Sequence, residues 1–189
     1  MDSLSITDFR CFSGQHEVVL RPLTLVIGEN STGKTSLLPA IRIANDIRFE
    51  RTPRFNQPPF LMGAFEDIVS RHSPKFSVGV SVGRVSVGSA ESLRIAVDFV
   101  ASDSEPVIDT LTASWSNITC SFRDESGKKL AKLVVNGVTV LENYEFRRMA
   151  SLELSSWSYL LQFLAWAMEE EKKQDKELIR SIGRVAQYN

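Results

Sequence analysis

One short stretch near the N-terminus restricts the fold more than any other. Residues 28–35 read Gly-Glu-Asn-Ser-Thr-Gly-Lys-Thr, which is a glycine, four variable positions, and then glycine, lysine and threonine. This is the spacing of a phosphate-binding loop, in which the glycines let the backbone approach a phosphate and the lysine supplies positive charge. Residues 23–27 have the composition of a buried strand and a helical pattern begins at Lys34, so the context is the strand–loop–helix that the motif needs.

The loop predicts a role for each of its chemical groups. We expect Lys34 to reach the β- and γ-phosphates of a nucleotide and the Thr35 hydroxyl to bind Mg²⁺. The expected nucleotide site consists of the loop and the first residues of the helix, which are Gly28, Glu29, Asn30, Ser31, Thr32, Gly33, Lys34, Thr35 and Ser36.

Composition excludes several broad classes. The chain has 189 residues, enough for a proper core, and its 43% hydrophobic and 24% charged residues are ordinary globular values. A formal net charge of −1 gives no global positive field, although a local basic strip is compatible with it. Cys11 and Cys120 fit no metal-site spacing and are expected to be buried free thiols. No apolar run reaches the ~18 residues of a membrane span and no signal peptide is evident, so a cytoplasmic protein is expected.

The first part of the chain reads as strands followed by a helix. Residues 4–9 and 17–20 are expected to be short strands around a turn at Ser13-Gly14. The helix after the loop is expected to turn one apolar face inward, and Pro39 should distort it locally without ending it. That face is formed by Leu37, Leu38, Ile41, Ala44 and Ile47. Three prolines make residues 51–59 extended.

In the rest of the chain the spacing of apolar residues changes twice. Residues 76–141 alternate apolar and polar side chains, and Asn136-Gly137 is a two-residue hairpin signal, so an antiparallel meander of five to six strands is expected. From about Tyr144 the pattern is helical, and residues 152–168 are apolar almost all round, as in a helix that is buried or meets a partner. The predicted class is therefore α/β or α+β. A phosphate-loop core sheet (1–70) is followed by an antiparallel lobe (71–143) and a helical segment (144–189).

Two other phosphate-loop classes fit poorly. Small-molecule kinases alternate strands and helices after the loop, whereas a long antiparallel meander follows it here. GTPases need a D-x-x-G and an N-K-x-D motif; residues 124–127 match the first only formally, inside a predicted hairpin turn, and the second is absent.

The arrangement that remains resembles the N-terminal half of an ABC-class, AAA-type ATPase head of the RecF/SMC/OLD kind. The resemblance is carried by Ile6-Thr-Asp-Phe-Arg-Cys-Phe12 and by residues 20–38, which run from Leu-Arg-Pro-Leu-Thr through the loop to Ser-Leu-Leu. Asp8 stands where the family usually has asparagine. Residues 55–68 also resemble a segment of bacterial ATPases in this group, many of them encoded in defence-like systems. The match is specific over residues 1–70, topological over 71–143 and weak beyond.

The resemblance implies a dimer that binds ATP and Mg²⁺ between two heads and drives a nucleic-acid or defence effector such as a nuclease. In such heads one copy supplies the phosphate loop and the other a signature motif, and a Walker B strand ends in Asp-Glu. Neither motif is evident here, because the closest Walker B candidate, residues 93–98, is interrupted by Arg94 and followed by Phe99. We therefore expect an N-terminal portion or one half of a split ATPase, with a homodimer or split partner completing the head. No catalytic residue is assigned, and the chain alone should bind nucleotide at best weakly and hydrolyse almost nothing.

Two residues outside the loop are weaker candidates. By the resemblance, Arg10 corresponds to an N-terminal arginine that reaches nucleotide phosphates, and Gln57 to the glutamine that senses γ-phosphate and Mg²⁺. A surface arginine and a turn glutamine between prolines are the alternatives. The alternative function for the whole chain is a nucleotide-binding scaffold that does not hydrolyse ATP.

Overall fold

The computed structural model describes residues 2–29, 33–49, 51, 53–71, 73–82, 92–125, 128–135 and 137–145. Within them the chain forms strands and two helices in the following order. The elements are β1 (Ser3–Phe9), β2 (Phe12–Val19), α1 (Lys34–Arg48), β3 (Asn56–Gln57), β4 (Phe60–Leu61), α2 (Phe65–Ile68), β5 (Lys75–Val82), β6 (Leu93–Ser102), β7 (Glu105–Trp115), β8 (Ile118–Glu125), β9 (Lys128–Val135) and β10 (Val138–Glu145).

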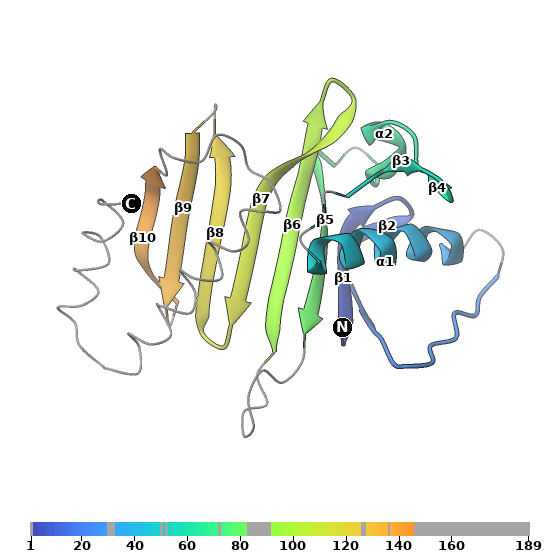
Figure 1. Cartoon of the computed structure of the whole chain (residues 1–189), viewed down its shortest axis with the longest axis horizontal. Coiled ribbons are helices and arrows are strands. Elements are labelled where there is room, and N and C mark those ends of the chain that lie inside the picture. The colour runs from blue at the N-terminus through green and yellow to red at the C-terminus, as the bar shows by residue number, and fades with distance from the viewer. Residues whose placement is uncertain are drawn as a thin grey trace.

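One sheet of eight strands dominates the molecule (Figure 1). Its strand order is β10-β9-β8-β7-β6-β5-β1-β2, and every neighbouring pair is antiparallel. The two-stranded hairpin β3-β4 is separate. The fold is mixed α+β, which is one of the two predicted classes, and most of it is antiparallel sheet.

Alternation of apolar and polar side chains explains why these segments are strands. In β6, Ile95, Val97 and Phe99 are buried and the residues between them are not. Registered pairing places Val97 opposite Val78 of β5 on one side and opposite Leu111 of β7 on the other. Because successive side chains point to opposite faces, this register lines the apolar residues up on one face of the sheet.

The expected meander is confirmed. Strands β5 to β10 follow one another in the sheet, and Val135 pairs with Val138 across the two-residue connection that Asn136-Gly137 predicted. The meander is continuous with the first strands, because β1 pairs with β5, with Ile6 opposite Val78. Backbone hydrogen bonding across that pair makes a single sheet.

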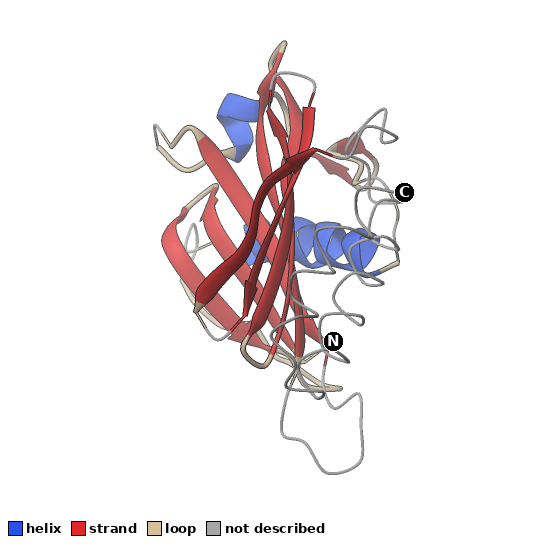
Figure 2. Ribbon diagram, turned by 90° about the vertical axis from the view of Figure 1, so that its left-hand side faces the viewer, coloured by secondary structure: helices blue, strands red, loops and turns tan. Residues whose placement is uncertain are grey.

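Helix α1 lies across one face of the sheet, over β1 and β5 (Figures 1 and 2). Its buried side chains are Leu37, Pro39, Ala40, Ile43, Ala44 and Ile47. Pro39 sits inside the helix without ending it, as expected, and its ring contributes to the buried face. The buried stripe is rotated from the predicted one, since Leu38 is 53% exposed and Ile41 only partly buried. Contact with a sheet on one side selects the stripe centred on Ala40, Ile43 and Ile47.

An aromatic cluster fixes residues 53–71 to the sheet. Phe76 of β5 stacks on Phe99 of β6 with ring centroids 5.0 Å apart. Phe55, before β3, meets Phe99 edge-on at 5.3 Å, and Phe65 of α2 lies 5.7 Å from Phe76. These rings bury large areas and prefer offset or edge-on contacts. The proline-rich segment is therefore anchored at Phe55 even though its hairpin tip is exposed.

The turn between the first two strands differs from the predicted one. It falls at Arg10-Cys11 and not at Ser13-Gly14, so β2 begins at Phe12. Asp8 and Arg10 have positive φ angles of 51° and 52°, and the pairing shifts register between Thr7 and Phe9. The Gly14 amide donates to the Asp8 carboxylate (2.7 Å), which fixes this bulged turn. A side-chain contact across the turn thus overrides the local glycine signal.

Residues 23–27 form no strand, contrary to their pattern. Leu23, Leu25 and Ile27 are 79, 75 and 90% exposed. The Arg21 amide donates to the Thr24 hydroxyl (2.9 Å) and turns the chain away from the sheet edge at β2. An apolar run becomes a buried strand only beside other strands, and no described strand pairs with this one.

Two more expectations concern the end of the chain. Tyr144 and Glu145, expected at the start of a helical segment, close strand β10. The helical pattern of residues 152–168 lies outside the described residues. In the part of the chain that the structure describes, no helix has the length and apolarity to cross a membrane.

Candidate nucleotide site

The N-terminus of α1 is an uncapped helix end. Gly33 occupies the N-cap position with φ 93° and ψ 2°, no described side chain makes a cap hydrogen bond, and the first turn carries no acidic residue. The amides of Ser36 and Leu37 already donate to the Gly33 carbonyl (3.0 and 3.1 Å). The amides of Lys34 and Thr35 lie ahead of the first intrahelical bonds. Free amide donors and the positive end of the helix dipole together favour an anion at this point.

Lys34 is the first residue of α1, and its ammonium group turns back over the loop. Nζ donates to the Gly28 carbonyl (2.5 Å) and to the Glu29 carbonyl. Among the described residues, no carboxylate lies within ion-pair distance of this ammonium group. Within the described residues, its positive charge is therefore compensated by the dipoles of these two carbonyls. The geometry brings Gly28, Glu29 and Lys34 together, next to Gly33. Asn30, Ser31 and Thr32 fall outside the described ranges.

Gly33 is required here for two separate reasons. Its positive φ is a conformation that side chains rarely adopt, and a Cβ at this position would lie 2.6 Å from Cys11 Sγ and 3.1 Å from Phe12 Cζ. The turn between β1 and β2 thus packs directly against the start of α1. Sequence reasoning missed Cys11 and Phe12 as supports of the loop, because nothing in their local pattern signals a contact so far along the chain.

Thr35 is exposed at the second position of α1, where its hydroxyl is accessible to a ligand. Among the described residues, no group of three or more His, Cys, Asp or Glu side chains could hold a metal ion by itself. A Mg²⁺ ion that accompanies a nucleotide does not need such a cage, because it keeps waters and takes phosphate oxygens as ligands. The residues present therefore fit Mg²⁺ held by Thr35 together with bound phosphates.

Asp98, the acid of the weak Walker B candidate, serves the sheet. It lies in the middle of β6, where it accepts hydrogen bonds from Lys75 Nζ (2.7 Å) and the Ser77 hydroxyl (2.6 Å) of the neighbouring strand. The hydrogen bond from Lys75 to Asp98 raises the pKa of Lys75. These contacts agree with the interpretation of residues 93–98 as a strand of the meander.

The two weaker candidates make contacts away from the loop. The Arg10 guanidinium donates to the Met62 carbonyl at a long 3.5 Å, and Gln57, exposed in β3, accepts from Arg54 Nη1 (2.9 Å). Neither makes a hydrogen bond or an ion pair with the described residues among 28–36. Arg10 does adjoin Cys11, which touches Gly33, so the nucleotide-contact role of Arg10, like that of Gln57, stays a prediction.

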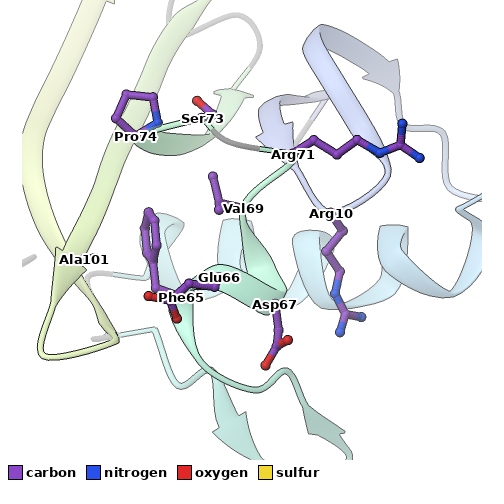
Figure 3. Close-up of a pocket in the computed structure, with 9 residues that line it drawn as sticks. All are labelled: Arg10, Phe65, Glu66, Asp67, Val69, Arg71, Ser73, Pro74 and Ala101. Atoms are coloured by element: carbon purple, nitrogen blue, oxygen red, sulfur yellow. The ribbon is translucent and has the colours of Figure 1, made fainter.

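Arg10 also lines a pocket of about 720 Å³ (Figure 3). Phe65, Glu66 and Asp67 of α2 and Arg71 line it as well. Arg10 and Arg71 point in different directions in Figure 3, and both signs of charge are present. The pocket shows no convergence of like charges, so the helix N-terminus is the better anion site.

The two cysteines lie in different environments. Cys120 is buried in β8, and burial raises the pKa of its thiol to about 12. Cys11 is exposed, which corrects the expectation of two buried thiols. The difference arises because Cys11 occupies a turn, whereas Cys120 takes an inward position of a central strand.

The fold and this site define a class. An uncapped glycine-rich helix N-terminus with a lysine at its first position is the anion site of phosphate-loop nucleotide-binding proteins. The chain matches the family model of the AAA ATPase domain over residues 1–181, and it belongs to that family. Searches of curated proteins and of solved structures gave no match. Family membership supports nucleotide binding.

Proposed function

We propose that this chain binds ATP with Mg²⁺ at residues 28–36 and forms the ATP-binding portion of an ABC/SMC-like ATPase head. The observation that carries the proposal is the start of α1. Amides ahead of the first intrahelical bonds, a first turn without acids and the Lys34 ammonium group without a described carboxylate partner together suit a bound anion. A triphosphate supplies that anion, with Lys34 on the β- and γ-phosphates and Thr35 on Mg²⁺.

Lys34→Ala tests this site directly. The variant removes the only side-chain cation on the described part of the loop and leaves the sheet untouched, so Mg·ATP binding should be lost while thermal unfolding is unchanged. Lys75→Ala is the matched control, because it removes a lysine whose partner is Asp98 on the sheet. Calorimetric titration with Mg·ATP measures both. Binding of ATP by Lys34→Ala at wild-type strength would overturn the assignment.

Completion of the head by a second surface is the next part of the proposal. Leu23, Leu25, Val26 and Ile27 are exposed directly before the loop, and a run of this kind is expected to be covered. We assign the covering surface to the remainder of the head, supplied by a homodimer or a split partner. Polar replacement of Leu25 and Ile27 should then weaken assembly while leaving the isolated sheet stable. Light scattering with and without ATP measures whether this assembly forms.

Hydrolysis requires more than a phosphate cradle. A water must be polarised and charge on the γ-phosphate stabilised. Asp98, the acid of the Walker B candidate, is already occupied by hydrogen bonds from Lys75 and Ser77. We therefore expect background turnover from this chain alone and turnover after the missing motifs are restored. Tight ATP binding without turnover in the completed assembly would favour the alternative function, a nucleotide-binding scaffold.

The wider role follows the resemblance of residues 1–70 to RecF/SMC/OLD-type heads. On that basis the assembly is a cytoplasmic machine whose ATP-driven closure acts on a nucleic acid or on a defence effector such as a nuclease. Co-purification of the intact assembly, followed by assay of nuclease activity with and without ATP, tests this role.

A further inference from the structure

The C-terminal end of α1 carries a cluster of arginines around one exposed aromatic ring. Phe49, the C-cap residue of α1, is 56% exposed. The guanidinium carbons of Arg48 and Arg51 lie 5.3 and 5.8 Å from the centroid of its ring. Both distances are within the range of cation–π attraction, so the ring holds two guanidinium groups at the surface.

Two further arginines extend this cluster toward the β3-β4 hairpin. Arg42 donates to the Pro58 carbonyl (3.0 Å) and Arg54 donates to the Gln57 side chain (2.9 Å). A guanidinium group has five N–H donors, so each of these bonds leaves others for a ligand. We call Arg42, Arg48, Phe49, Arg51 and Arg54 the arginine–phenylalanine surface.

Positive charge exceeds negative charge on this surface. Asp46 lies among Arg42, Arg51 and Arg54, whose charges act on its carboxyl group. None of the four arginines has a carboxylate within 4.0 Å in the described part of the chain. Glu50 adds one more acid in the sequence, outside the described residues. Four cations against two acids leave a local positive excess on a chain whose net charge is −1.

The helix fixes the position of the ring. The Phe49 amide donates to the carbonyls of Asn45 and Asp46 (3.1 and 3.2 Å), and the Arg51 amide donates to the Asp46 carbonyl (2.8 Å). The backbone that carries the ring and one of its two guanidinium groups is thus ordered by the helix end. A preformed surface binds with a smaller loss of conformational entropy than a flexible one.

From this surface we infer that the end of α1 binds single-stranded nucleic acid. Guanidinium groups match phosphate oxygens in a planar, two-pronged geometry, and a stacked arginine presents its N–H edge outward. An exposed aromatic ring adds a stacking partner for a base, which neither an acidic peptide nor a lipid headgroup would use. The site is distinct from the phosphate loop, which lies at the opposite end of the same helix.

Fluorescence anisotropy with a labelled oligothymidylate at low salt tests the inference. Wild type should bind, and Arg48→Gln/Arg51→Gln should bind at least about tenfold more weakly, with a log–log salt slope lower by about 1.4 for two lost phosphate contacts. Phe49→Ala should weaken binding as well, because the ring orients both guanidinium groups. Arg94→Gln/Arg123→Gln removes the same charge from strands β6 and β8 and should bind like wild type.

Three outcomes would overturn the inference. They are equal binding by wild type and Arg48→Gln/Arg51→Gln, equal weakening by the control pair, and equal affinity of wild type for oligothymidylate, poly-glutamate and phosphatidylserine vesicles. Thermal unfolding of each variant separates loss of binding from loss of folding. Lys34→Ala should bind the oligonucleotide like wild type, so failure of this inference is distinguishable from failure of the ATP site.

Discussion

The Cys11 thiol packs against the α-carbon of Gly33, so that a Cβ on Gly33 would lie 2.6 Å from Sγ. This contact joins the turn between β1 and β2 to the N-cap residue of α1. The sheet that begins with β1 therefore sets the position of the loop, although no strand of the described residues leads into it.

Gly33→Ala should weaken ATP binding at least tenfold and lower stability. The left-handed backbone alone costs about 1–2 kcal/mol with a side chain, and the contact with Cys11 adds to it. Gly137→Ala is the matched control, because Gly137 has φ 74° and nothing within 4 Å of an added Cβ. Chemical denaturation should show a larger loss of stability for Gly33→Ala than for Gly137→Ala. The double variant Cys11→Ala/Gly33→Ala removes the thiol contact and should recover only the difference between these two losses. Equal losses in the two single variants would show that the thiol contact contributes nothing.

The two cysteines should react at very different rates. At pH 8 a thiol with a pKa of about 12 is ionised in roughly one molecule in 10⁴, and Cys120 is also buried, so it should resist maleimide reagents until the protein unfolds. Exposed Cys11 should be labelled in the native state. Mass spectrometry of peptides after labelling with and without denaturant measures both sites. Native labelling of Cys120 would contradict its place in the core.

Asp98→Asn should lower stability slightly and leave ATP binding unchanged. The ion pair with Lys75 is partly exposed, with side-chain exposures of 51 and 23%, so its loss should cost about 0.2–1 kcal/mol. Because the pKa of Lys75 is raised in the folded state, the contribution is present below the ordinary lysine value of 10.5 and is lost as pH rises through the folded pKa. Denaturation at pH 8 and above pH 11 should show the difference between wild type and variant shrinking. Loss of ATP turnover in the completed assembly, with unchanged stability, would instead make Asp98 a catalytic candidate.

Ile27→Ala and Ile6→Ala make the same chemical change in opposite environments. Ile6 is fully buried in β1, so its truncation should cost about 2–5 kcal/mol. Ile27 is 90% exposed, so the same truncation should change the stability of the chain by less than about 0.5 kcal/mol. Thermal and chemical unfolding of the two variants measure the contrast. A large loss for Ile27→Ala in the isolated chain would mean that residues 23–27 are packed within it.

Local sequence patterns determined a large part of this structure. Alternating side chains specify β5 to β10, because a period of two has one face to bury. Asn136-Gly137 sets the last hairpin, and the glycines and lysine of residues 28–35 set the uncapped start of α1. Each of these signals depends on a few neighbouring residues, so it can be recognised from the sequence alone.

Long-range contacts decided the rest. The strand-like run at residues 23–27 stays exposed because a strand needs neighbours that local pattern cannot supply. The first turn moves to Arg10-Cys11 because the Asp8 carboxylate binds the Gly14 amide. Joining of β1 to β5 and packing of Cys11 on Gly33 likewise depend on how separate groups meet in space. Tertiary structure fixes such contacts because their free energy comes from burial and pairing of groups that the local sequence does not bring together.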